Sequence, residues 1–120
     1  IGPATATVVA SEALSAGDFI NIYDNAGTPN CRKADAANGR PADGFVLTAV
    51  ASAANATAYL QGNNTALTGL TAGTNMFLSA TTAGTATATA PSATGNILQR
   101  LGRALNATTL PFEADPYIQL

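Results

Sequence analysis

The side chains that could do chemistry in this chain are few. It has no histidine, and its single cysteine, Cys31, is followed by two cations, Arg32 and Lys33, which could lower the pKa of a thiol. A cysteine or serine nucleophile would nevertheless lack an imidazole base, the usual activating partner. Cys31 falls in a predicted strand, where a cysteine is more often a small buried hydrophobic residue. The sequence therefore predicts no catalytic residues and no enzyme.

Six of the seven carboxylates are spread over predicted turns and loops, at Asp18, Asp24, Asp35, Asp43, Glu113 and Asp115. They lack the Asp-x-Asp-x-Asp spacing of a calcium loop, and one thiol cannot build a metal cage. Asp35, Arg40 and Asp43 share one long loop and could rim a ligand, but a solvated surface with one weak ion pair is the preferred interpretation. We expect no metal and no cofactor.

Charge is sparse in the 120 residues: five lysines and arginines against seven aspartates and glutamates give a net charge of −2 and a pI near 4.6. This balance argues against nucleic acid and anionic membranes as partners, since both require clustered cations. No apolar run is long enough to span a bilayer and no secretion-signal pattern opens the sequence, so we expect a soluble chain. A surface with so few charges favours a protein that packs against neighbours.

Two patterns occur twice in the same order, which predicts an internal pseudo-two-fold repeat. The segment 44–57 resembles 95–108, with Gly44 matched to Gly95, and a Leu-x-Ala-Gly motif that ends at Gly17 returns ending at Gly73. Hydrophobic residues make up 47% of the chain but are largely alanine, so each half is too small for a core of its own and we expect one domain with a shared core. Its expected parts are an N-terminal arm, two halves and a C-terminal tail, at 1–10, 11–62, 67–116 and 117–120.

Alternation of apolar and polar residues, with turn residues between, predicts an all-β chain. Strands are expected over 19–23, 28–34, 44–51, 56–61, 75–79, 85–89, 96–104 and 108–113, while 4–10 is a strand or an extended arm. Segment 96–106 also carries one apolar helical face, but its match to the β-branched series of 44–51 favours a strand. Short connections predict a small, mostly antiparallel β-barrel, or a sandwich, with extended arms at both ends.

Two further sets of residues are assigned roles from their types and positions. Four glycines are expected to set turns, because glycine adopts positive φ without a steric penalty: Gly17, Gly27, Gly73 and Gly84. Apolar side chains near the termini and the arginines form a candidate interface, since a lone domain would leave them exposed to water. This set is Ile1, Val8, Val9, Arg40, Arg100, Arg103, Tyr117, Ile118 and Leu120.

The second half carries glycine-and-strand patterns at 69–73, 85–91, 95–99, 102–104 and 112–113. In these patterns the chain resembles small virion proteins of tailed bacteriophages, in particular head decoration (cement) proteins and the related C-terminal modules of head-fibre and tail proteins. The resemblance implies a non-catalytic β-barrel on the capsid surface that forms homotrimers, or dimers, and bridges subunits of the major capsid protein. A receptor- or glycan-binding module of a phage fibre or tail protein is the alternative.

Overall fold

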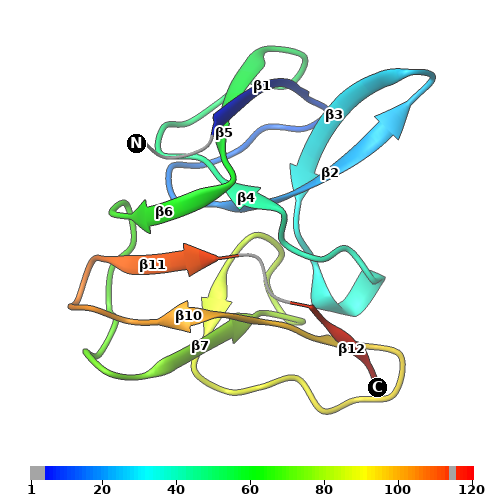
Figure 1. Cartoon of the computed structure of the whole chain (residues 1–120). Coiled ribbons are helices and arrows are strands. Elements are labelled where there is room, and N and C mark those ends of the chain that lie inside the picture. The colour runs from blue at the N-terminus through cyan, green and yellow to red at the C-terminus, as the bar shows by residue number, and fades with distance from the viewer. Residues whose placement is uncertain (1–4, 114–115) are drawn as a thin grey trace.

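The computed structural model describes residues 5–113 and 116–120, and regular structure within them is almost entirely β, which confirms the predicted all-β class. The strands are β1 (Thr5–Ala10), β2 (Phe19–Asn25), β3 (Thr28–Lys33), β4 (Gly44–Phe45), β5 (Asn55–Tyr59), β6 (Gln61–Asn64), β7 (Asn75–Leu78), β8 (Ala86–Thr87), β9 (Ile97–Leu98), β10 (Arg100–Arg103), β11 (Leu110–Glu113) and β12 (Ile118–Gln119). One turn of 3-10 helix, η1 (Ala36–Asn38), lies between β3 and β4. Figure 1 shows two stacked lobes, with β1 to β5 above and β7, β10, β11 and β12 below.

Five strands of the first half close into a barrel in the order β1-β3-β2-β4-β5, so the predicted barrel is confirmed. β2 and β3 correspond to the strands expected over 19–23 and 28–34, with the expected turn at Gly27 between them, and they form a hairpin. Gly27 has a φ of 90° and its N–H donates to the Asp24 carboxylate at 3.0 Å. β1 pairs with β5 on one side and with β3 on the other. Residues 5–10 are therefore a strand of the barrel wall and not a free arm.

The remaining strands form three smaller sheets, β10-β7-β8, β11-β6 and β12-β9. β8 has only two residues, although the alternation of Thr85, Thr87 and Thr89 predicts a longer strand. Threonine and alanine offer little apolar surface to hold a longer strand against the core. The barrel is thus closed by strands within residues 5–59 alone, and the smaller sheets pack beneath it.

The Leu-x-Ala-Gly repeat is reproduced in the backbone hydrogen bonds of the two halves. The N–H of Gly17 donates to Val46 O at 2.8 Å, and the N–H of Gly73 donates to Ala104 O at 2.7 Å. Gly17 and Gly73 have φ of 88° and 84°, as a turn before a strand requires. The motif therefore builds the same turn twice.

The match of Gly44 to Gly95 is wrong. Ile20 of β2 pairs with Gly44, and Met76 of β7 pairs in the same way with Gly102. A Cβ on Gly44 would lie 2.6 Å from Tyr59 O, and a Cβ on Gly102 would collide with Pro111 O, whereas one on Gly95 would meet nothing within 4 Å. Gly44 and Gly102 are equivalent because a neighbouring strand passes directly over each.

The apolar side chains form two clusters. The smaller one fills the barrel and includes Ile20 and Val46. The larger one joins both halves around Phe19, Phe45 and Phe112, whose ring centroids lie 5.4 to 6.2 Å apart. Only this larger cluster is the shared core that the repeat predicts.

Several boundaries differ from the predictions. The strand expected over 44–51 is limited to β4, β6 crosses the expected end of the first half at residue 62, and the tail contains β12, which pairs with β9. The strand expected over 96–104 is broken at Gln99, whose buried side chain accepts from Ala42 N at 2.7 Å and donates to Ala42 O at 3.0 Å. The helical alternative for this segment is wrong.

Candidate functional site

An exposed strip of side chains along β9 and β10 is the candidate interaction surface. Ile97, Gln99 and Leu101 point into the core, so Leu98 and Arg100 point outward by the alternation of a strand. A register shift between Arg100 and Gly102 keeps Arg103 on the same outward face.

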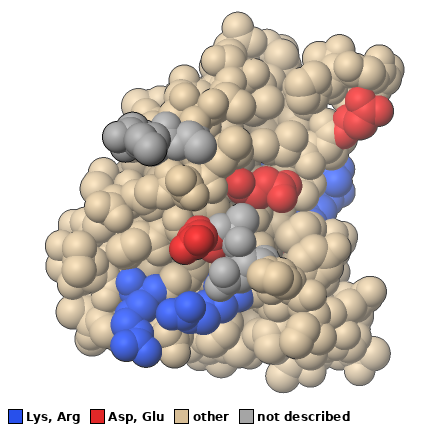
Figure 2. Space-filling model, viewed as in Figure 1, with Lys and Arg blue, Asp and Glu red and all other residues tan. Residues whose placement is uncertain are grey.

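Neighbouring strands extend this face. Residues opposite each other on paired strands share one side of a sheet, and here the pairs are Leu98 with Ile118, Arg100 with Phe77, and Arg103 with Asn75. Ile118 is 63% exposed. We call this set, Asn75, Phe77, Leu98, Arg100, Arg103 and Ile118, the arginine strip. In Figure 2 lysine and arginine side chains gather over the region of β10, at the lower left.

Both guanidinium groups of the strip donate to the same side-chain oxygen. Asn75 Oδ1 accepts hydrogen bonds from Arg100 Nε (3.2 Å), Arg100 Nη2 (3.1 Å) and Arg103 Nε (3.5 Å). All three residues are exposed. Fixed, planar donors next to apolar side chains favour recognition of a protein surface that offers carboxylates, since arginine and large apolar residues are enriched at the centres of interfaces.

The structure brings part of the predicted interface together. Arg100, Arg103 and Ile118 lie in the arginine strip, and Tyr117 and Leu120 are exposed at 50% and 37% next to it in sequence.

The other predicted interface residues lie elsewhere. Val8 is 5% exposed inside the barrel, so its assignment to an interface is wrong, and Val9 is half-buried in the barrel wall. Arg40 is half-buried in the loop after η1, and Ile1 lies outside the described residues. The remaining candidates for docking are therefore at the C-terminal end of the chain.

The candidate chemical groups have structural partners. Cys31 is buried in the barrel, and burial raises the pKa of its thiol, so the interpretation as a buried hydrophobic residue is confirmed. The Asp35 carboxylate caps η1 by accepting from Ala37 N at 2.9 Å, and the Asp43 carboxylate accepts from Ile22 N at 2.8 Å.

Within residues 5–113 and 116–120, no three histidine, cysteine or acidic side chains are grouped to hold a metal ion. No helix of the described chain has the length and hydropathy to cross a membrane.

Burial changes the ionisation of two carboxyl groups. Asp18 is 9% exposed, and desolvation raises its pKa, although a hydrogen bond from Ser15 N (2.8 Å) opposes this shift. Desolvation likewise raises the pKa of Asp43, against hydrogen bonds from Ile22 and Asn21. Both groups bond backbone or neighbouring side chains, so they stabilise loops and are not arranged for proton transfer.

A polar network on the barrel surface was not predicted from the sequence. The guanidinium of Arg32 lies 4.2 Å from the centroid of the Tyr23 ring, and Arg32 Nε donates to Asn21 Oδ1 at 3.0 Å. Asn21 Nδ2 in turn donates to the Asp43 carboxylate at 3.2 Å. The hairpin turn at Gly27 sets the register that places Asn21 opposite Arg32, so the turn was the signal that could have revealed this network.

Comparisons with known proteins give one fold match. No family model and no curated protein sequence matches the chain. Among solved structures, the N base of the head fibre protein gp8.5 of bacteriophage phi29 superposes with a TM-score of 0.64 over 95% of this chain and 95% of that chain, at 13% sequence identity. At this identity the likeness establishes the fold.

Proposed function

We propose that this chain is a structural protein of a bacteriophage virion, located on the outer surface of the capsid, where it stabilises the shell by bridging subunits of the major capsid protein. The observation that carries the proposal is the likeness of the fold, over nearly the whole of both chains, to the base of a phage head fibre. The sparse charge and the structural use of Cys31, Asp35 and Asp43 agree with a role without a reaction.

The mechanism we propose is linkage between binding and assembly. A module that binds the assembled shell, and not its separated subunits, adds its binding free energy to the stability of the shell. Many symmetry-related copies, each bound weakly, hold such a lattice together through avidity.

Fractionated virions test the location. Heads and tails of the phage that encodes the chain are separated, and the chain is quantified in each by mass spectrometry. We expect it in the heads, and we expect heads that lack it to release their DNA at a lower temperature than heads to which the purified chain is restored. Absence of the chain from virions would refute the proposal.

A receptor- or glycan-binding module of a phage fibre or tail protein is the second candidate function. It is favoured by the fact that the matched structure is part of a fibre. Recovery of the chain only in the tail fraction, or equal heat stability of heads with and without it, would select this alternative.

We also propose that copies of the chain associate through the arginine strip. β11 packs beside β10 and ends in the exposed Glu113, so the same region carries carboxylate, guanidinium and apolar groups that could meet their complements on a second copy. Sedimentation equilibrium should show an oligomer whose dissociation constant rises about tenfold in Arg103→Ala or Ile118→Ser. Thr57→Ala, on the barrel, is the control and should leave it unchanged. A wild-type chain that stays monomeric at high concentration would contradict this assignment.

A further inference from the structure

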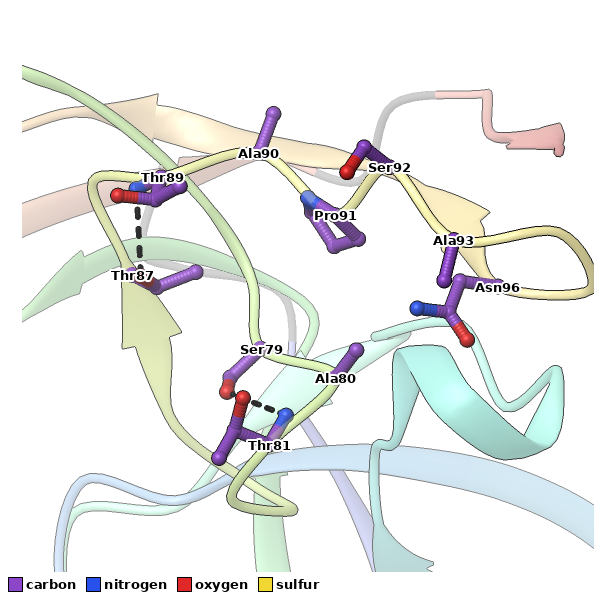
Figure 3. Close-up of a pocket in the computed structure, with 10 residues that line it drawn as sticks. All are labelled: Ser79, Ala80, Thr81, Thr87, Thr89, Ala90, Pro91, Ser92, Ala93 and Asn96. Carbon is purple, nitrogen blue, oxygen red and sulfur yellow. Dashed lines mark hydrogen bonds between the residues drawn. The ribbon is translucent and has the colours of Figure 1, made fainter.

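A hollow of about 290 Å³ lies between the turn that follows β7 and the loop that precedes β9 (Figure 3). Its walls consist of hydroxyl groups, one amide, and the methyl and ring carbons of alanine and proline. The lining residues are Ser79, Ala80, Thr81, Thr87, Thr89, Ala90, Pro91, Ser92, Ala93 and Asn96. None of them is charged or aromatic.

Several polar groups of the lining have hydrogen-bonding capacity left over. Ser79 is 6% exposed, and its Oγ accepts from the N–H groups of Thr81 (3.1 Å) and Thr82 (3.0 Å), which leaves its own proton to donate. No described residue accepts that proton. The side chains of Ser92 and Asn96 likewise have no hydrogen-bond partner among the described residues, and Figure 3 shows the Asn96 amide on the wall of the hollow.

The chemistry of the lining defines the class of ligand. A charged ligand would lose hydration without gaining a counter-charge. Hydroxyl and amide groups alternating with methyl groups complement a molecule that is itself patterned in this way, as a sugar ring is. The volume lies at the lower end of ligand pockets, so it fits about one sugar unit.

We propose that this hollow binds a neutral N-acetylated hexose. In this arrangement the Ser79 hydroxyl donates to a sugar oxygen, and the Asn96 amide pairs with the acetamido group or with a ring hydroxyl. The methyl groups of Ala80 and Ala93 cover the acetyl methyl or the C–H face of the ring. This proposal names a site and a ligand class for the glycan-binding alternative given above, and its failure would leave the capsid role untouched.

The test is a titration of the ¹⁵N-labelled full chain with N-acetylglucosamine, followed by amide chemical shifts. We expect saturable, millimolar binding that moves the amides of Ser79, Thr81, Thr89 and Asn96 and leaves the barrel unmoved. An open hollow of this size supports only weak binding to one unit, so copies on a virion would act by avidity.

Variants make the titration specific. Asn96→Asp keeps the shape of the side chain but adds a charge and removes a donor, and it should weaken binding about tenfold. Thr89→Val, which removes an exposed hydroxyl from the wall of the hollow, should also weaken binding. Asn55→Asp on β5 is the matched control and should leave binding unchanged. The proposal is overturned by unsaturable shifts, by saturation at other amides, by equal affinity in Asn96→Asp, or by equal affinity for glycerol, which would indicate binding at high concentration only.

Discussion

The equivalence of Gly44 and Gly102 predicts which glycines can be replaced by alanine with little loss of stability. A Cβ at Gly44 would lie 2.6 Å from Tyr59 O, and a Cβ at Gly102 would collide with Pro111 O. Both obstacles are backbone atoms of a neighbouring strand, β5 for Gly44 and β11 for Gly102, so the backbone must move to admit a methyl group. Overpacking of this kind costs about 1–3 kcal/mol. Gly102 adds strain, because its φ of 155° lies at the limit of the range that favours glycine.

Gly95→Ala is the matched control, since Gly95 would be the sensitive residue if the repeat paired it with Gly44. Its φ is 93°, but a Cβ there would meet nothing within 4 Å, so the expected cost is about 1 kcal/mol from backbone strain alone. Urea unfolding followed by circular dichroism measures all three variants. We expect Gly102→Ala to lose the most stability, with Gly44→Ala between it and Gly95→Ala. A loss in Gly95→Ala as large as in Gly102→Ala would refute both the register of the repeat and the close approach of the strands.

Three further predictions concern buried side chains. The folded-state pKa of Asp18 is raised, so its contribution to stability is present below its unfolded-state pKa and lost as pH rises through the raised value. The free energy of unfolding should therefore fall over that pH window. In Asp18→Asn, this dependence of the free energy of unfolding on pH should be smaller. Gln99→Leu should lower the free energy of unfolding by about 2–4 kcal/mol, because it leaves two buried backbone groups of Ala42 unpaired. The control Gln61→Leu, at an exposed position, should change it little. Urea unfolding measures both variants. Cys31 should react with a thiol reagent only as fast as the barrel opens, and rapid labelling of the native chain would contradict its burial.

Local sequence patterns were sufficient to predict those elements whose pairing partners lie close by in the sequence. The alternation of Ile20 and Ile22 and the turn at Gly27 predicted the β2–β3 hairpin, and the Leu-x-Ala-Gly motif predicted the turn at Gly17. These elements depend on strand periodicity and on the φ that glycine allows, both of which are properties of a few adjacent residues.

The candidate surfaces could be predicted only in part. The arginines and the apolar C-terminal residues were identified by type. Whether they lie on one face of the molecule depends on the pairing of β9 with β12 and on the register shift beside Arg100. The hollow near Ser79 was not predicted, because serine, threonine and alanine in a low-complexity segment are indistinguishable from a solvated loop until the chain folds over them.

The sequence by itself determined that the chain is all-β, sparsely charged, internally repeated and without an imidazole base. Only the tertiary structure decided which repeat residues correspond, that Val8 lies inside a barrel, and that Arg100 and Arg103 share one face with Ile118. The physical reason is that strand pairing joins residues far apart in the chain. A shift of one residue in that pairing turns every side chain to the opposite face, and local composition does not fix the shift.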